Sequence, residues 1–395
     1  MRAFAEIDLD ALRSNVALLR ERAGSARLLA VVKADGYGHG LVPCAKAALE
    51  GGAQWLGVAL LEEALALRAA GIKARTIAWM TPLGSDFDSA IREDIDLSIP
   101  TREHLKAVIS SGRKVGVRPR VHLEIDTGMS RGGVFADSYD FRTLLDDLVD
   151  AVKKDLVEIV GAWTHFARAD EPEEAMNVEQ IARFDRALDQ IFATGLSIPI
   201  HHIANSAATL SDVSKDRAKY SMMRGGIAIY GLSPDVSTMG DSSSLGLKPV
   251  MTLKAQLQLV KDVPAGASVG YGATAIVERD TKLGVVAMGY ADGIPRNASS
   301  AVGVFVLESK GDSEGKSGRR APIIGRVSMD QFVVDLGKES SAETGDLVIV
   351  FGDGATGEYT ADDWARACGT INYEIVTRIG PRVPRIWRNY ERTSQ

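Results

Sequence analysis

Short apolar runs alternate with amphipathic stretches from the start of the chain to Tyr230. After an opening run at Phe4–Ile7 and a helix that begins near Asp8, eight runs predict strands: Leu29–Val32, Trp55–Ala59, Thr76–Met80, Asp96–Ile99, Val121–Ile125, Ile159–Thr164, Ile198–Ala204 and Met222–Tyr230. Helical periodicity separates most of them, as in Leu60–Ala70, Arg102–Ser110, Phe141–Lys153 and Glu179–Ala193. Eight strand–helix units in this length predict an α/β fold, a parallel (β/α)8 TIM-like barrel.

The pattern then changes. Residues 233–244 form a polar, serine-rich connector, and strand-like runs dominate beyond it: Thr252–Val260, Leu283–Met288, Val302–Leu307, Gln331–Leu336 and Leu347–Phe351. We therefore expect two domains, a barrel over residues 1–240 and a mostly-β domain over residues 241–395.

Composition narrows the class of protein. With 46 basic against 52 acidic residues, a net charge of −6, nothing predicts a nucleic-acid or membrane-surface partner. Two cysteines, Cys44 and Cys368, form no CxxC pair and indicate a reducing compartment. The first residues lack the apolar core of a signal peptide, and no apolar run is long enough to span a membrane. These features predict a cytoplasmic protein.

Two segments imitate nucleotide-binding loops. Residues 352–357 match GxGxxG, but the helix that follows (about Asp362–Cys368) is short and the chain soon ends, so we interpret them as a turn. Thr360 and Asp363 have the spacing of a capping box at that helix. Residues 311–317 fall one residue short of a P-loop and are interpreted as a surface loop.

The segment AVVKADGYGHG (30–40) offers the first candidate chemistry. Lys33 follows a β-branched run directly, so it stands at the end of a buried strand, where a charged ammonium is costly. Burial lowers a lysine's pKa, and the neutral amine can form a Schiff base with an aldehyde. Tyr37 can offer its hydroxyl to an anion among the glycines. The alternative is a lysine that extends to solvent before an ordinary turn.

Other polar residues also fall at predicted carboxyl ends of strands, where barrels place active sites. Ser206 and Gly226 occupy the last two loops, the usual phosphate position, and Arg224 lies within an apolar strand, where its charge needs an acceptor or a salt bridge. Arg131 and His165 follow earlier strands, although His165 could equally be a core histidine. His201 and His202 are assigned to strand packing, and His39 receives no catalytic role. The sequence has no Cys/His cluster with the spacing of metal ligands, so we predict no protein-bound metal.

Several motifs in order carry a family resemblance. Besides residues 30–40 they are HLEIDTGMSRGG (122–133), WTHFARADE (163–171), HHIANSAA (201–208), MMRGGIAIYGLSP (222–234), VGYGATA (269–275), GYADG (289–293), RVSMDQF (326–332) and INYEIVTRIGPRVPR (371–385). With these motifs the chain resembles the alanine racemases, enzymes that use pyridoxal 5′-phosphate, over nearly its whole length.

The resemblance implies roles for individual residues. Lys33 would hold the cofactor covalently and act as one base, and Tyr271 would act as the other from the second subunit of a homodimer. Cofactor contacts are implied for Tyr37, His165, Asn205, Ser206, Arg224, Gly226, Ile227 and Tyr373, and substrate-side contacts for Arg131, Met329 and Tyr290. Arg224 would face the pyridine nitrogen with His165 orienting it. The implied reaction interconverts L- and D-alanine, supplying D-alanine for peptidoglycan.

Three other functions fit part of this pattern. A serine or broad-specificity racemase of the same fold stays open, because sequence does not set pocket volume. A barrel decarboxylase would carry a carboxylate near the pyridine nitrogen, which Arg224 argues against. A non-catalytic cofactor-binding barrel would lack the second domain and Tyr271.

One position departs from the family. Many alanine racemases carry a CO2-carboxylated lysine two residues before the Asp of the DTGM motif, and Glu124 stands there in this chain. Glutamate supplies a carboxylate without CO2, but its stem is shorter. We expect Glu124 to provide the negative charge that orients Arg131, through a water or a bound anion.

Overall fold

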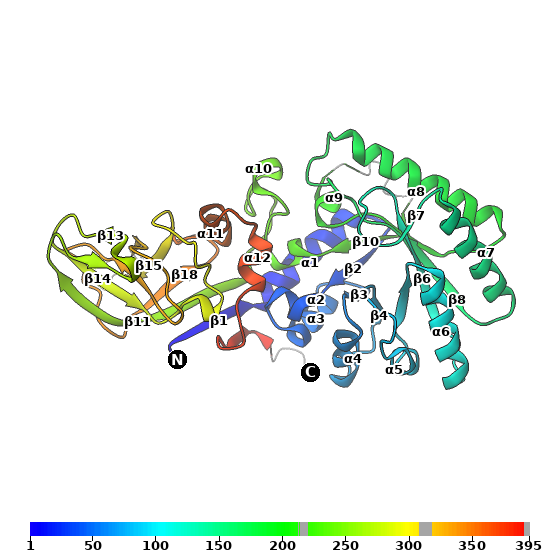
Figure 1. The fold of residues 1–395 in the computed structure, drawn as a ribbon, viewed down its shortest axis with the longest axis horizontal. Coiled ribbons are helices and arrows are strands. Elements are labelled where there is room, and N and C mark those ends of the chain that lie inside the picture. Colours follow the sequence, from blue (N-terminus) through cyan, green and yellow to red (C-terminus); the bar gives the residue numbers. More distant parts are fainter. Residues whose placement is uncertain (212, 214–219, 308–317, 391–395) are drawn as a thin grey trace. The chain divides into compact units, whose positions relative to one another are not determined.

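The computed structural model describes residues 1–211, 213, 220–307 and 318–390. The chain divides into two compact units (Figure 1). One, called the barrel unit, comprises Leu12–Gly36 and Leu41–Leu247. The other, called the β unit, comprises Met1–Ala11, Tyr37–Gly40 and Lys248–Gln395. Among the described residues, no helix has the length and apolarity needed to cross a membrane.

The barrel unit is built on eight parallel strands in the order β10-β2-β3-β4-β5-β6-β8-β9. They are β2 (Arg27–Val31), β3 (Trp55–Val58), β4 (Arg75–Ala78), β5 (Asp96–Ile99), β6 (Arg120–Asp126), β8 (Glu158–Trp163), β9 (Ile200–His202) and β10 (Met222–Gly225). Two backbone hydrogen bonds, from Ser221 N to His201 O (3.1 Å) and from Arg224 N to Ala204 O (3.2 Å), link the two ends of this order. The barrel is thus nearly closed, and the predicted fold class is confirmed.

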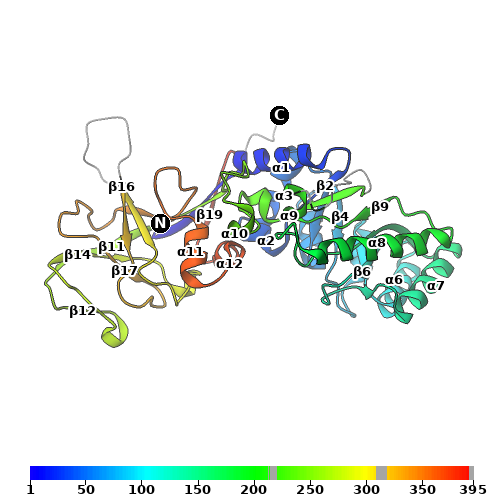
Figure 2. The same ribbon diagram turned by 90° about the horizontal axis from the view of Figure 1, so that it is seen from above.

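Helices pack around the outside of these strands (Figure 2). They are α1 (Leu9–Ala23), which begins in the β unit, α3 (Leu41–Glu50), α4 (Leu61–Ala69), α5 (Phe87–Arg92), α6 (Arg102–Val115), α7 (Tyr139–Lys153), α8 (Ala175–Ala193) and α9 (Ser206–Leu210). Local sequence explains their ends: the Ser138 hydroxyl accepts from Phe141 N (3.0 Å) at the start of α7, and Gly116 ends α6 at φ 72°. The four predicted helices are all present, with α6 and α8 longer than expected. Shorter elements are α2 (Lys33–Tyr37), β7 (Val134–Phe135), η2 (Ile227–Tyr230) and α10 (Val236–Met239).

The last predicted barrel strand was too long. Met222–Tyr230 reads as one apolar run, but β10 stops at Gly225 and a 3-10 turn follows. The Ser206 hydroxyl accepts hydrogen bonds from Gly226 N (2.8 Å) and Ala228 N (3.3 Å), which turns the backbone out of the strand. Apolar character alone does not distinguish a buried strand from a buried turn.

The β unit is mostly β structure, as predicted, and most of its strand pairs are antiparallel. Its strands are β1 (Ala3–Asp8), β11 (Met251–Val263), β12 (Ser268–Val269), β13 (Ala275–Ile276), β14 (Thr281–Val286), β15 (Gly303–Leu307), β16 (Gly318–Pro322), β17 (Phe332–Asp335), β18 (Leu347–Phe351) and β19 (Arg385–Arg388). The main sheet runs β16-β15-β18-β11-β1-β19, with β14 pairing β11 and β17. Helices α11 (Ala361–Cys368) and α12 (Asn372–Thr377) and the 3-10 turns η3 (Tyr271–Ala273) and η4 (Tyr290–Asp292) complete it.

The opening strand does not belong with the barrel. The predicted barrel domain of residues 1–240 includes it, but β1 pairs antiparallel with β11 and parallel with β19, so it lies inside the sheet of the β unit. Alternate residues Ala5 and Ile7 are fully buried there. Alternation predicts a strand with one buried face, but it does not identify the partner strands.

The GxGxxG segment is a turn, as interpreted. The Glu358 carboxylate accepts from Gly354 N (3.1 Å), Thr356 N (3.0 Å) and the Thr356 hydroxyl (2.7 Å), so the loop's donors are bound within the loop. Thr360 and Asp363 form the predicted capping box. The P-loop-like residues 311–317 lie outside the described residues.

Candidate active site

The backbone after β2 makes a left-handed turn directly beyond Lys33. Ala34, Asp35 and Tyr37 have φ of 54°, 54° and 51°, and Gly36 between them has φ 61°. A left-handed conformation costs an L-residue roughly 1–2 kcal/mol, so the predicted glycine turn is more strained than the glycines alone suggest. Strain of this kind persists only where surrounding contacts enforce it.

Glu63 supplies such contacts. Its carboxylate accepts hydrogen bonds from three backbone N–H groups, those of Ala34 (2.6 Å), Ala59 (3.0 Å) and Leu60 (3.1 Å). The loops after β2 and β3 are therefore tied to the first turn of α4. No feature of the sequence singled out this glutamate.

The environment of Lys33 favours a neutral amine. Burial lowers the pKa of Lys33, and the positive charges of Arg131 and Arg224 lower it further, whereas the Glu63 carboxylate opposes them. A lysine with a lowered pKa has the free amine that nucleophilic and proton-transfer chemistry require.

Arg224, on β10, is only 4% exposed. Its Nη1 donates to His202 Nδ1 (3.0 Å) and His202 O (3.2 Å), and its Nη2 donates to His165 Nδ1 (3.0 Å), Thr164 O (2.9 Å) and Ile203 O (3.1 Å). No carboxylate of the described residues lies within ion-pair distance, so the alternative of a direct salt bridge is not what the structure contains. Burial lowers the pKa of Arg224 to about 9, and the side chain stays cationic at neutral pH.

The two histidines beside Arg224 are neutral. A guanidinium only donates, so the Nδ1 atoms of His165 and His202 must accept and their Nε2 atoms carry the protons. Burial and the charge of Arg224 lower the pKa of both rings well below the ordinary value, in agreement with this tautomer. Our assignment of His202 to strand packing alone was wrong. Its inward position on β9, beside the strand that carries Arg224, was the missed signal.

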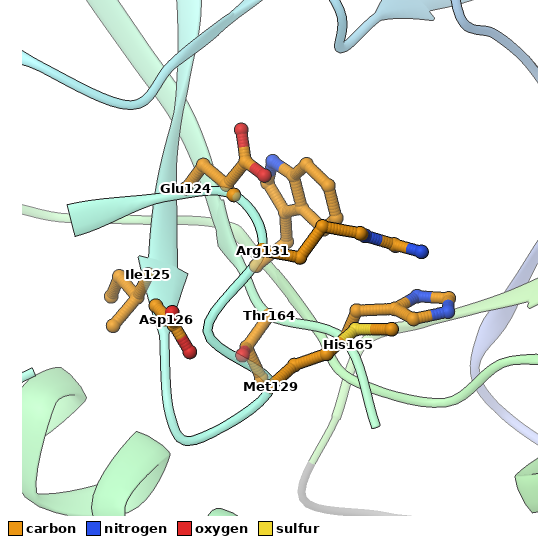
Figure 3. A pocket seen from close by; sticks show the side chains of 9 residues that line it. Glu124, Ile125, Asp126, Met129, Arg131, Thr164 and His165 are labelled. Carbon is orange, nitrogen blue, oxygen red and sulfur yellow. The ribbon is translucent and has the colours of Figure 1, made fainter. Parts of the chain in front are cut away.

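A small cavity of about 10 Å³ lies at the ends of β6 and β8 (Figure 3). It is lined by Glu124, Ile125, Asp126, Met129, Arg131, Gly132, Trp163, Thr164 and His165. This volume holds about one water molecule. Figure 3 shows the Arg131 side chain extending toward His165 and away from the Glu124 carboxylate.

Glu124 is held inside this cavity. Its Oε2 accepts from the Ser98 hydroxyl (3.2 Å), which itself accepts from Trp163 Nε1 (3.0 Å). A Cβ on residue 132 would lie 2.6 Å from Glu124 Oε1, so Gly132 makes room for the carboxylate. Burial raises the pKa of Glu124 to about 7, although Ser98 and the charge of Arg131 both oppose this rise.

The last two barrel loops meet at Ser206. Besides accepting from Gly226 N, this serine is 5% exposed and begins α9, where the Asn205 side chain caps the helix by accepting from Ala208 N (3.0 Å). Ile227, which opens the 3-10 turn, is buried. These predicted residues are therefore adjacent in the barrel unit.

The β unit brings together other predicted residues. Tyr271 and Met329 line one hollow of about 570 Å³ with Gly270, Arg326, Ser328, Asp330, Gln331 and Val333. They are 73% and 53% exposed. Tyr290 is 38% exposed, and its backbone N donates to Ser328 O (3.0 Å) in the same region. Tyr37 and Tyr373 lie against each other with ring centroids 6.3 Å apart, and burial raises the pKa of Tyr37.

Among the described residues, no group of three His, Cys, Asp or Glu side chains is placed to hold a metal ion.

The fold and the site together define a class of two-domain barrel enzymes. The barrel is nearly closed and holds a strand-end lysine of lowered pKa and a buried arginine, and a mostly-β domain follows it in the chain. Two family models match this chain, alanine racemase N-terminal domain over residues 7–234 and alanine racemase C-terminal domain over residues 250–387. The chain belongs to the alanine racemase family and is an isomerase.

Individual relatives agree along the full length. The alanine racemase of Beutenbergia cavernae is 48% identical over 97% of both chains, and that of Frankia casuarinae is 48% identical over 98% of this chain and 96% of its own. The crystal structure of alanine racemase from D-cycloserine-producing Streptomyces lavendulae superposes with a TM-score of 0.91 at 46% identity, covering 98% of this chain and 97% of that one. The enzyme of Streptomyces coelicolor superposes with a TM-score of 0.92 at 45% identity, covering 98% of each.

Proposed function

We propose that this chain binds pyridoxal 5′-phosphate and interconverts L- and D-alanine by a two-base reaction. The observation that carries the proposal is Arg224, a buried cation held by two neutral imidazoles near an amine of lowered pKa. Both curated relatives named above are alanine racemases.

The residues of the barrel unit fit this cofactor. Lys33 provides the amine for covalent attachment, and Ser206 with the neighbouring backbone of Gly226 and Ile227 suits a phosphate group. The structure records hydrogen bonds from both terminal nitrogens of Arg224 to described residues and none from its Nε, which leaves one N–H for the pyridine nitrogen. The family resemblance implies cofactor contacts for Tyr37 and Tyr373 as well.

The bound cofactor would supply an electron sink that acidifies the Cα–H of the amino acid. The chain's own residues do the rest. Lys33 Nζ removes or returns the Cα proton on one face, and the Tyr271 hydroxyl does so on the other. Arg131 would bind the substrate carboxylate together with a backbone N–H of the partner subunit's Met329, and Tyr290 would lie at the entrance. His165 and His202 hold Arg224, which would donate a hydrogen bond to the ring nitrogen of the cofactor and so keep that nitrogen without a proton.

The exposure of Tyr271 supports a homodimer in which this tyrosine completes the site of the partner. Mixing Lys33→Ala and Tyr271→Phe subunits tests this arrangement. If each site takes one base from each chain, the heterodimer keeps one intact site and recovers activity that neither variant has alone. If both bases come from the same chain, the mixture stays inactive.

Reduction of the purified protein with borohydride tests the covalent assignment. The absorbance of the protein-bound cofactor should disappear, and mass spectrometry should then find the adduct on the peptide that carries Lys33. An adduct on another lysine, or none, would overturn it.

Kinetics on alanine and serine in both directions separate the proposed activity from a broad-specificity racemase. We expect kcat/KM to favour alanine. A role in supplying D-alanine for peptidoglycan inside the cytoplasm is part of the proposal, and its test is whether deleting the gene makes growth depend on added D-alanine.

A further inference from the structure

The barrel interior contains a row of buried polar side chains that leads away from Arg224. Asp96 on β5 and His122 on β6 are 0% exposed, and His202 on β9 is 1% exposed. In the sheet order β5 is next to β6, and only β8 lies between β6 and β9. Polar groups this deep in a barrel are costly unless hydrogen bonds satisfy them.

The end of the row farthest from Arg224 is the carboxylate of Asp96, which accepts several hydrogen bonds. Asp96 accepts from Arg75 Nη2 (2.7 Å), Arg120 Nε (2.6 Å) and His122 Nε2 (3.1 Å). These partners lower the pKa of Asp96 to about 2 against the effect of burial. Because an ionised carboxylate only accepts, His122 Nε2 carries a proton.

At the other end of the row, Arg224 determines which nitrogen of His202 carries the proton. As its guanidinium only donates, His202 Nδ1 accepts and His202 Nε2 carries the proton. The N–H of His202 Nε2 is buried and has no acceptor among the described residues. The Nδ1 atom of His122 is also buried without a partner in that part of the chain. One ring thus has a spare donor and the other a spare nitrogen.

The two rings are neighbours. Their centroids lie 5.8 Å apart at an interplanar angle of 83°. Gly161 on β8, the strand between β6 and β9, makes room for the ring of His122, since a Cβ there would lie 2.3 Å from His122 Nδ1 and 2.9 Å from Ile200 O. A water that bridges two nitrogens spans about 5–6 Å, and rings whose centroids are 5.8 Å apart are close enough for their unpartnered nitrogens to share one water.

We propose that His122 and Asp96 are positioning residues for Arg224, acting through a hydrogen-bond chain from the guanidinium to His202, across one buried water to His122, and on to Asp96. Every donor in this chain points toward Asp96. Asp96 holds the proton of His122 on Nε2, which leaves Nδ1 free to accept. An acceptor for His202 Nε2–H in turn makes His202 Nδ1 a better acceptor for Arg224, in the way that carboxylates tune metal-bound histidines.

The inference rests on the proposed function, in which Arg224 contacts the cofactor, but its first test does not depend on activity. Histidine-selective ¹⁵N labelling of the holoenzyme followed by solid-state NMR reports which ring nitrogens carry protons. The chain has six histidines, and the signals of His122 and His202 can each be assigned from their loss in a His→Asn variant. We expect both rings to be protonated at Nε2 only. A proton on Nδ1 of either ring would overturn the chain.

Two substitutions of His122 separate positioning from structural support. In His122→Asn the amide oxygen replaces the accepting Nδ1, but the donor to Asp96 is lost. In His122→Gln the amide nitrogen replaces the donating Nε2, but the acceptor facing His202 is lost. We expect the Gln variant to have a higher free energy of unfolding than the Asn variant. We expect the Asn variant to have a kcat and a His202 ¹⁵N signal closer to those of wild type than the Gln variant has. The expected loss of kcat in the Gln variant is about tenfold, equivalent to one neutral hydrogen bond, with KM little changed.

Activity that follows stability in the two variants would show that His122 serves packing only and would overturn the proposal. If a variant does not fold, the tautomers of the wild-type protein still decide the question. An inactive wild-type protein would instead refute the proposed function, whatever its tautomers are.

Discussion

Glu124→Gln removes a charge from the cavity at the ends of β6 and β8 without changing the shape of the side chain. The wild-type carboxyl is buried, accepts from the Ser98 hydroxyl, and sits where Gly132 leaves room for it. Two cations, Arg131 and Arg224, favour its ionised form. The amide oxygen of glutamine can still accept from Ser98, so the substitution tests the charge.

The effect on stability follows from the raised pKa. Burial raises the pKa of Glu124 from an ordinary 4.5 to about 7; at 1.36 kcal/mol per unit, the folded protein loses up to about 3 kcal/mol on ionising this group. The folded state holds the proton more tightly than the unfolded chain. This group's stabilising contribution is therefore fully present below pH 4.5 and lost as the pH rises through 7. Glutamine pays no such cost, so the variant should gain about 1–3 kcal/mol relative to wild type between pH 5 and pH 8.

Activity should change in the opposite direction. We expect the ionised carboxylate to orient Arg131, through the water that the small cavity can hold. The kcat/KM of wild type should then rise through pH 7, and the variant should lack this rise and lose activity worth about 1–3 kcal/mol at pH 8. Because the carboxylate needs no CO2, bicarbonate should not change wild-type activity.

Urea unfolding at pH 5 and pH 8 and pH profiles of kcat/KM are the assays, with the exposed Glu173→Gln as a control for the loss of one charge. A variant with wild-type activity would mean that Glu124 does not orient Arg131. A stability difference that stays the same at both pH values would refute the link between burial and its pKa.

Three other predictions concern single positions. Tyr271→Phe should lower turnover roughly 10²–10⁴-fold because a general base is lost, while cofactor absorbance is retained; unchanged turnover in both directions would eliminate this tyrosine as a base. Glu63→Ala should lower the free energy of unfolding by about 2–3 kcal/mol, because three backbone N–H groups lose a charged acceptor; the exposed Glu62→Ala should change it little, and equal effects in urea unfolding would refute the role of the carboxylate. Gly161→Ala should cost about 1–3 kcal/mol or more from overpacking, whereas Gly380→Ala, where a Cβ meets nothing closer than 3.8 Å, should be tolerated; similar melting temperatures for the two would contradict this.

Much of the fold could be predicted because strands and helices differ in the spacing of their apolar residues along the chain. Each of the eight barrel strands lies where an apolar run predicts it, and so do β11, β14, β15, β17 and β18 of the β unit. The sequence does not predict β12, β13, β16 and β19, which are short or polar. The predictions were wrong where the structure of a segment depends on which strand it pairs with or on a turn in the backbone. The opening strand β1 falls within residues 1–240, the range predicted for the barrel domain, but its hydrogen bonds with β11 and β19 place it in the β unit.

The candidate site could be predicted to the same depth. Four candidates can be recognised from the sequence because they are polar residues at strand ends, where a barrel places its active site: Lys33, Arg131, His165 and Arg224. His202 did not, because a histidine in an apolar strand has the same pattern whether it packs or accepts a hydrogen bond. Its partner Arg224 is 22 residues away in the chain, and only the adjacency of β9 and β10 joins them.

The sequence by itself determined which segments become strands and helices and which residue types stand at their ends, since both depend on neighbours a few residues apart. The tertiary structure decided what those residues do to one another. It placed Glu124 where burial brings its pKa to about 7, put Gly161 under the ring of His122, and bent the chain after Lys33 into a left-handed turn held by Glu63. Each of these outcomes depends on desolvation and contacts between segments distant in the chain, which local periodicity does not encode.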